Sequence, residues 1–188
     1  MLIKASKLRD KKNLNKISNK NPGYYKWYAN LSSLKKLLNS KYISKKYIDT
    51  LINNLSTIEI NNKTYYYIYV GISVKESIQD RLDWHVNQKH SISSVQSGFL
   101  STLRQTLSSL ISMNQYEEIK TNQFIDSLYI DYYEIDLPIK SNEAKELIES
   151  IEKEELNNNL IPLNLKDNKN ELVKPFLREL SAVRKRSK

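Results

Sequence analysis

The sequence predicts an α/β fold in which helices flank a small, mostly antiparallel sheet of three or four strands. Runs rich in Tyr, Val and Ile, which are typical of strands, recur within residues 24–29, 57–70 and 128–135. The segments between and after these runs carry leucines and isoleucines at helical spacing. The order of strand, helical hairpin, strands and helices favours helices packed on a small mixed sheet.

The chain of 188 residues suits one domain with elaborations better than two domains. Residues 1–20 form a basic N-terminal arm that is polar, and we expect it to be mobile as far as Pro22-Gly23. Residues 21–188 then form a single domain. Its elaborations are a helical insertion at residues 31–55 and a basic helix at the C-terminus.

The first half of the domain begins with the aromatic strand at residues 24–29. The insertion at residues 31–55 has two apolar helical faces, which predict a helical hairpin. Residues 57–60 and 64–70 flank Asn61-Asn62-Lys63, a strong signal for two strands joined by a tight turn. The two helical faces consist of Leu31, Leu34, Leu37 and Leu38, and of Tyr47, Ile48, Leu51, Ile52 and Leu55.

Gly71 is predicted to end the second strand of this hairpin. Ser73-x-x-Glu76 is a capping-box pattern, which predicts that a helix begins there and buries a stripe of Ile78, Leu82 and Val86. Residues 90–97 are expected to form a polar loop.

The second half of the domain alternates helices with one strand. Leucines from Leu100 to Leu110 mark a helix, and residues 128–135 form a further strand. A Glu-rich helix covers about residues 142–156, and a closing helix carries the cationic C-terminus. The expected buried stripes are Ala144, Leu147, Ile148 and Ile151 in the Glu-rich helix, and Phe176, Leu177, Leu180 and Val183 in the closing helix.

The formal charge is +9, which favours a polyanionic partner because phosphate contacts drive nucleic-acid affinity. The chain has no cysteine, so disulfides, thiol catalysis and cysteine-based zinc sites are excluded. We find no apolar run long enough to span a membrane and no apolar leader at the N-terminus. The expected location is therefore the cytoplasm, without a membrane partner.

Two strand tripeptides and four later residues form an ordered series. The tripeptides are Gly23-Tyr24-Tyr25 and Tyr69-Val70-Gly71, and the later residues are Arg81, His85, Glu152 and Asn164. This series resembles the GIY-YIG nuclease superfamily over roughly residues 22–170. The chain departs from the family pattern at Tyr24, which replaces Ile, and in the separation of about 40 residues between the tripeptides. The insertion at residues 31–55 accounts for that separation.

The resemblance implies that Tyr25 acts as a general base and that Tyr69 binds the phosphate or the attacking water. Arg81 would clamp the phosphate, since a guanidinium is planar and permanently charged. His85, one helical turn later, would donate to the scissile phosphate or hold a tyrosine. A half-buried sheet tyrosine and a capping histidine are the alternatives for single residues of these types.

The resemblance also implies one metal-binding glutamate about a dozen residues before the late asparagine, which selects Glu152. Helical periodicity leaves Glu155 as a competitor and Glu149 as a third candidate. Mg²⁺, or another divalent cation such as Mn²⁺, accepts one carboxylate together with phosphate and water. Gly23, Gly71 and Asn164 would support the site, with Asn164 bracing it through hydrogen bonds.

These features predict a divalent-metal-dependent endonuclease acting on duplex DNA, of the type II restriction kind. Cutting both strands favours a homodimer, and a restriction enzyme implies a DNA methyltransferase that acts on the same site. Lys26 and Lys75 could contact backbone phosphates. The insertion at residues 31–55 and the loop at residues 90–97 are candidates for reading bases.

Two alternatives remain open at this stage. The first is a non-catalytic nucleic-acid-binding protein, which the charge alone supports equally well. The second is a nuclease of DNA repair or of a mobile element.

Overall fold

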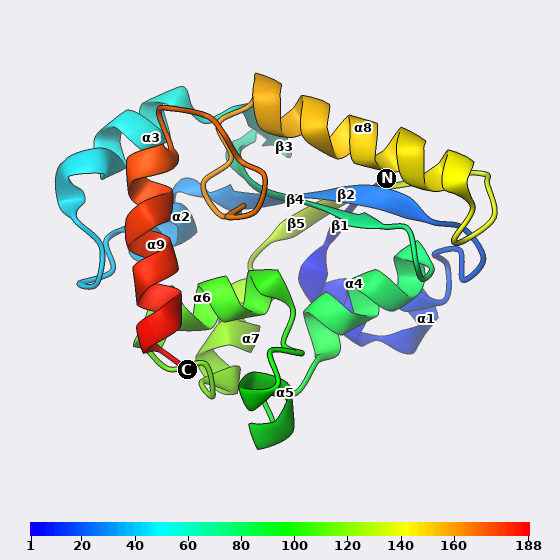
Figure 1. The fold of residues 1–188 in the computed structure, drawn as a ribbon, viewed down its shortest axis with the longest axis horizontal. Coiled ribbons are helices and arrows are strands. Elements are labelled where there is room, and N and C mark those ends of the chain that lie inside the picture. Colours follow the sequence, from blue (N-terminus) through cyan, green and yellow to red (C-terminus); the bar gives the residue numbers. More distant parts are fainter.

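The computed structural model describes residues 1–188, except for the side chain of Tyr47. Its centre is a five-stranded antiparallel sheet with the order β1-β5-β2-β4-β3, flanked by helices (Figure 1). The strands are β1 (Leu2–Lys4), β2 (Gly23–Asn30), β3 (Thr57–Ile60), β4 (Lys63–Ser73) and β5 (Tyr129–Glu134). The predicted α/β class is confirmed. The sheet is larger than predicted because β1, within the basic arm, pairs with β5.

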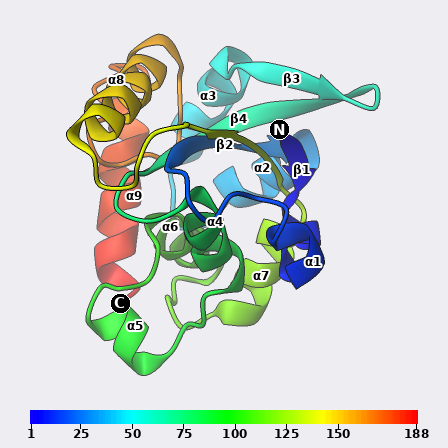
Figure 2. The same cartoon turned by 90° about the vertical axis from the view of Figure 1, so that its right-hand side faces the viewer.

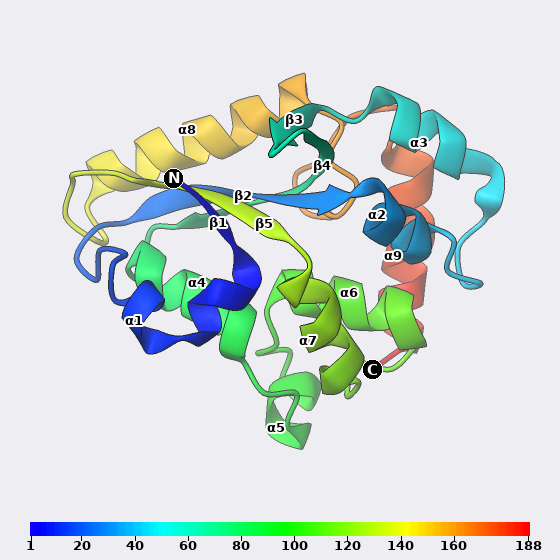
Figure 3. The same ribbon diagram turned by 180° about the vertical axis from the view of Figure 1, so that it is seen from behind.

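Helices cover the two faces of the sheet unequally (Figures 1 and 3). The helix α8 (Asn142–Asn158) lies on one face, which we call the α8 face. The helices α4 (Ile78–Asn87), α6 (Thr102–Ser112) and α7 (Glu118–Asp126) lie below the other face, which we call the α4 face. The closing helix α9 (Lys174–Arg186) packs on α6 at one end of the layers.

A β-bulge separates two tyrosines of β4 that simple alternation would place on one face. Trp27 pairs with Tyr69 and Tyr28 pairs with Tyr67, so Ile68 is an extra residue in β4. Tyr67 belongs to the apolar cluster under α8, whereas Tyr69 belongs to the core on the α4 face. Bulges re-aim side chains in this way beside functional sites.

The short length of β3 leaves part of β4 with an open edge. The β3–β4 hairpin extends from the side of the sheet, and its pairing stops at Tyr66 (Figure 2). Asn61 and Asn62 at its turn have φ of 50° and 58°, the left-handed backbone that tight hairpin turns need. Beyond this point the loop around Leu163 lies along β4, where Leu163 N donates to Ile68 O over 3.1 Å.

The N-terminal arm is ordered, so the expectation that residues 1–20 are mobile is wrong. After β1 come a 3-10 helix (Ala5–Arg9) and the short helix α1 (Lys11–Leu14). Four apolar side chains of this segment are buried in the core on the α4 face. They are too widely spaced among lysines to give a clear helical period; they are Ala5, Leu8, Leu14 and Ile17.

The predicted insertion is confirmed as two helices, α2 (Leu31–Leu38) and α3 (Ile48–Asn54), with a 3-10 turn (Lys45–Tyr47) before α3. The Glu-rich helix and the closing helix are also confirmed, although Leu147, placed in the buried stripe, is exposed. Among the described residues, no helix is long and apolar enough to cross a membrane.

Three local predictions need correction. β4 continues past Gly71 to Ser73, whose hydroxyl donates to the Glu76 and Ser77 carbonyls, and the N-cap of α4 is Ser77. The expected loop at residues 90–97 contains a short helix, α5 (Ile92–Gln96), capped by Ser91. The helix α7 was not predicted, because only three of its side chains are buried; these are Thr121, Phe124 and Ile125.

Candidate active site

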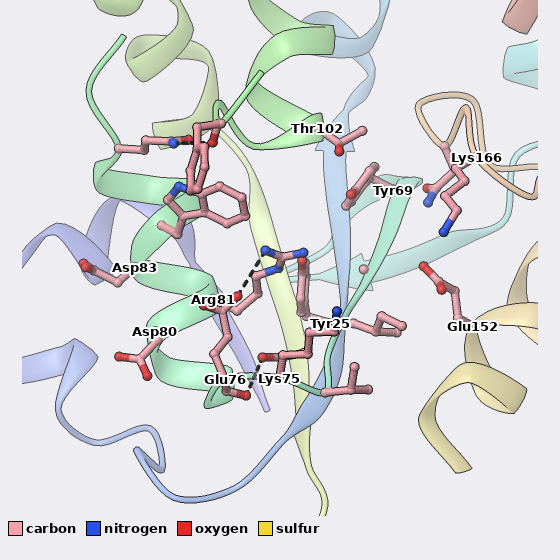
Figure 4. Close-up of a pocket in the computed structure, with 18 of the residues that line it drawn as sticks. Tyr25, Tyr69, Lys75, Glu76, Asp80, Arg81, Asp83, Thr102, Glu152 and Lys166 are labelled. Atoms are coloured by element: carbon pink, nitrogen blue, oxygen red, sulfur yellow. Dashed lines mark hydrogen bonds and ion pairs between the residues drawn. The ribbon is translucent and has the colours of Figure 1, made fainter. Parts of the chain in front are cut away.

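A cavity of about 890 Å³ lies beside the open edge of β4, between α4, α8 and the loop at residues 164–167. Tyr25, Tyr69, Arg81 and Glu152 all line it, and we call these four residues the open cluster. Figure 4 shows Arg81 and Glu152 on opposite sides, with the two tyrosines between them. Because no described strand pairs with β4 on this side, side chains from both faces of the sheet can meet around its open edge.

Tyr25 is completely buried, and its hydroxyl lies 2.5 Å from His85 Nε2. Its phenol ring crosses over Gly71, the residue paired with Tyr25 on β4. A Cβ at position 71 would lie 2.3 Å from the Tyr25 hydroxyl oxygen, so only glycine fits there. Gly71 is thus required by the path of the Tyr25 side chain towards α4. Gly23, the other supporting glycine, has no room for a Cβ against the Tyr133 carbonyl oxygen.

Burial keeps both tyrosines of the open cluster neutral. It raises the pKa of Tyr25 well above its ordinary value; Tyr69 raises this pKa further, and Arg81 lowers it. Burial also raises the pKa of Tyr69 to about 12, against the lowering effect of Arg81. A base role for Tyr25 therefore requires positive charge beyond that of Arg81.

His85 is buried on α4 at the predicted position one turn after Arg81. Its Nδ1 lies 3.0 Å from the hydroxyl oxygen of Ser101, a residue that the sequence analysis did not single out. Burial lowers the pKa of His85 well below its ordinary value, and Arg81 and Arg104 lower it further. The imidazole is therefore neutral, and it faces Tyr25 rather than the open part of the cavity.

Arg81 is the cation of the site. Its Nη1 donates to Glu76 Oε1 over 3.1 Å, and its guanidinium lies 4.6 Å from the centre of the Trp84 ring. Among the described residues, its buried Nε has no hydrogen-bond partner. Trp84 itself lines the cavity and supports Arg81.

Two glutamates of α8 occupy different surroundings. Glu152 lines the cavity, and its carboxylate has no hydrogen bond or ion pair with any described residue. Burial raises the pKa of Glu152, whereas Lys166 on the neighbouring loop lowers it. Glu155 instead lies on the α8 face, where it accepts from Lys26 over 2.5 Å and from the Tyr67 hydroxyl over 3.2 Å. We call Lys26, Tyr67 and Glu155 the closed cluster.

The remaining candidates are the supporting residue Asn164 and the two DNA-binding lysines, and not all of them lie at the cavity. Asn164 is buried, and its side-chain amide accepts from Val70 N over 2.9 Å and donates to Val70 O over 2.8 Å. It thereby replaces a strand partner at the open edge of β4. Lys75 lines the cavity, but Lys26 belongs to the closed cluster and is not brought to it.

No described group of three or more His, Asp or Glu side chains could by itself hold a metal ion. The site therefore offers a carboxylate, a guanidinium and two phenols, all aimed into one cavity. The model of the GIY-YIG catalytic domain matches residues 23–186. The chain belongs to the GIY-YIG family. Comparisons with curated proteins and with solved structures gave no match.

Family membership makes this chain a nuclease of the endonuclease class, with DNA as the substrate that the domain implies. Nucleases of this family generally use divalent metals. Sequence reasoning missed the roles of Glu76, Ser101 and Lys166. Glu76 and Lys166 line the cavity from loops, whereas Ser101 contacts the buried His85 from the N-cap of α6. None of the described residues of the insertion lines the cavity.

Proposed function

We propose that this GIY-YIG nuclease is a Mg²⁺-dependent endonuclease that cuts duplex DNA as a type II restriction enzyme. The observation that carries the proposal is the open cluster. Its cation and its carboxylate face one cavity without pairing with each other, and two phenols lie between them. Charges left apart in this way suit a ligand that carries both an anion and a cation, such as a phosphate with its metal ion.

The residues present fit a divalent cation at Glu152. Mg²⁺ often binds one or two carboxylates and completes its coordination with phosphate oxygens and water. Glu152 is half-buried, and its carboxylate has no other described partner. Such an ion would supply positive charge that neutralises the phosphate and favours ionisation of nearby water and phenol groups.

The other side chains of the site bind the phosphate and position the attacking water. Arg81 binds a non-bridging oxygen of the scissile phosphate and is held by Glu76 and Trp84. Tyr25 orients the attacking water, while Tyr69 holds the phosphate or the water. Tyr25 first gives its phenol proton to water in the cavity, and its phenolate oxygen then accepts a proton from the attacking water. As the water oxygen bonds to phosphorus, the bond to the 3′ oxygen breaks, and that oxygen takes a proton from water in the cavity.

The DNA backbone beyond the cleavage point requires further cations. A second cavity of about 390 Å³ is lined by Arg184 and Lys185, in the last turn of α9, and by Lys188, which follows this helix. Leu165 lines both cavities, so this group lies next to the candidate active site. We propose that these side chains neutralise phosphates adjacent to the scissile one.

The restriction role rests on the resemblance of two motifs to short restriction-enzyme-like members of the family. These are Pro22-Gly23-Tyr24-Tyr25-Lys26-Trp27 and, at residues 162–170, Pro-Leu-Asn-Leu-x-x-Asn-Lys-Asn. It implies a homodimer on a palindromic site and a methyltransferase that protects the same sequence.

The test is incubation of the protein with several supercoiled plasmids, with Mg²⁺ or with a chelator. We expect discrete linear fragments that depend on Mg²⁺ and share one short sequence at their ends. Metal-dependent nicking without a common sequence would remove the restriction role and leave the nuclease. Cutting that persists in the chelator would contradict the metal requirement.

A further inference from the structure

The buried imidazole of His85 connects Tyr25 to Ser101 through its two ring nitrogens. Nε2 lies 2.5 Å from the Tyr25 hydroxyl, and Nδ1 lies 3.0 Å from the Ser101 hydroxyl. All three side chains are almost completely buried. Because a neutral imidazole carries one proton, one of its nitrogens donates and the other accepts. The direction of the Tyr25 contact therefore depends on what Ser101 does.

The hydrogen bonds of Ser101 indicate which atom donates between His85 and Tyr25. Ser101 is the N-cap of α6, and its hydroxyl oxygen accepts from Arg104 N over 3.3 Å. Its own hydroxyl proton has one acceptor among the described residues, His85 Nδ1. A buried hydroxyl that did not use this acceptor would remain unsatisfied, at a cost in stability. Ser101 therefore donates to Nδ1, which leaves the imidazole proton on Nε2. The hydroxyl proton of Tyr25 is then directed into the cavity that this side chain lines.

We propose that Ser101 is a positioning residue that fixes His85 as the Nε2–H tautomer, so that the imidazole donates to the Tyr25 hydroxyl oxygen. In this arrangement His85 cannot take the tyrosine proton. Instead its N–H stabilises negative charge on the phenol oxygen as Tyr25 transfers its own proton into the cavity. The catalytic consequence rests on the proposed base role of Tyr25, whereas the tautomer itself does not.

The surrounding charges support a donor rather than a base. Burial lowers the pKa of His85 well below its ordinary value, and Arg81 and Arg104 lower it further, so the ring is a poor proton acceptor. The backbone of α4 that carries this ring is held by a second buried side chain. The buried Arg104 donates from Nη1 to the His85 carbonyl over 2.9 Å and to the Val86 carbonyl over 3.1 Å.

His90 provides an internal reference with the opposite tautomer. Its Nδ1 lies 2.5 Å from the Gln115 carbonyl oxygen, which can only accept, so Nδ1 carries the proton. Its Nε2 accepts from Arg104 Nε over 2.9 Å. The chain has only these two histidines, so a single nuclear magnetic resonance spectrum contains both states.

The test is a multiple-bond ¹H–¹⁵N correlation spectrum of full-length protein labelled with ¹⁵N-histidine, at neutral pH and without DNA or metal. We expect one ring protonated at Nε2 and one at Nδ1, with the second set of signals absent from His90→Gln. Two Nδ1–H rings in the wild-type protein would overturn the proposal. Because the spectrum requires no activity, this result is independent of whether the proposed function holds.

Substitutions of Ser101 then test its role. Ser101→Thr keeps the hydroxyl and should keep both the Nε2–H signal and the cleavage rate. Ser101→Ala should give His85 a mixture of tautomers and slow single-turnover cleavage about tenfold, the effect of one lost neutral hydrogen bond. Ser141→Ala removes the N-cap of α8 and serves as the control for losing a helix cap. If folded Ser101→Ala keeps the wild-type tautomer of His85, a group other than Ser101 fixes that tautomer, and the proposal is contradicted.

Discussion

The open cluster and the closed cluster contain the same kinds of side chain. Each combines a glutamate of α8 with tyrosine and a cation, and the two clusters lie on either side of the edge of β4. In the closed cluster the cation and the carboxylate form an ion pair, with Lys26 Nζ 2.5 Å from Glu155 Oε1. The Tyr67 hydroxyl donates to the same carboxylate. In the open cluster Arg81 and Glu152 face one cavity and make no ion pair with each other. The paired charges of the closed cluster hold α8 to the sheet. In the open cluster Glu152 has no partner among the described residues and Arg81 is held by Glu76 and Trp84, so both can bind a ligand.

The largest effect is expected at Tyr25. Tyr25→Phe should slow single-turnover cleavage by about 10²–10⁴-fold, the usual contribution of a positioned general base. The aromatic ring stays in place, so DNA binding and folding should be retained.

Tyr24→Phe is the matched control, because Tyr24 points to the opposite face of β2 and stacks on Tyr133. It should cleave at nearly the wild-type rate. If Tyr25→Phe cleaves normally, the tyrosine-base mechanism is wrong. If Tyr24→Phe is the inactive variant, the motif has been aligned one residue out of register.

Gly71→Ala should affect the open cluster through packing alone. The new Cβ would meet the Tyr25 phenol at 2.3–2.6 Å, so the ring has to move away from His85. We expect a loss of about 1–3 kcal/mol in the free energy of unfolding, typical of overpacking, together with slower cleavage. Denaturant unfolding and plasmid nicking measure the two effects, and a wild-type rate in this variant would show that the Tyr25–His85 contact is dispensable.

The smallest expected effect is on the free energy of unfolding. Replacing Glu155 should lower it, whereas replacing Glu152 should raise it. Glu155→Gln should lower the free energy of unfolding by about 1–3 kcal/mol, because Lys26 loses a charged partner. Glu152→Gln should raise the melting temperature at pH 8 by about 2–4 °C, the shift that roughly 1 kcal/mol produces in a domain of this size. A lower melting temperature for Glu152→Gln would indicate that this carboxylate has a structural partner.

The pH dependence of this gain follows from the raised pKa of Glu152, which burial causes. Between the ordinary pKa of a glutamate, about 4.3, and this raised value, the folded protein binds more protons than the unfolded chain. Ionisation of Glu152 therefore lowers wild-type stability as the pH rises through that window. The advantage of Glu152→Gln should be absent below about pH 4 and complete above the window.

The sequence predicted the parts of the site whose residues lie close together in the chain. The two glycine-tyrosine tripeptides predicted the paired strands β2 and β4, and the spacing of Arg81 and His85 predicted one helix face. The helical insertion and the Glu-rich helix followed from their apolar periodicity. Whether these residues act catalytically stays a prediction that the experiments above test.

The remaining features depend on contacts between distant segments. Alternation places Tyr67 and Tyr69 on the same face, and only the bulge at Ile68 separates them. The role of Ser101 arises because α6 begins beside His85, 16 residues earlier in the chain. The arm seemed polar because its four buried side chains are scattered, although β1 completes the sheet.

The central claim is that the open cluster, and not the closed one, holds the metal ion and the phosphate. Its most direct test is single-turnover cleavage of supercoiled plasmid by Glu152→Gln and Glu155→Gln in Mg²⁺, with DNA binding measured in Ca²⁺. We expect Glu152→Gln to lose at least about 10²–10³-fold in rate, the usual effect of removing one preorganised electrostatic contact, while it still binds DNA. Glu155→Gln should cleave at close to the wild-type rate. An active Glu152→Gln beside an inactive, folded Glu155→Gln would contradict the account and transfer the metal site to Glu155.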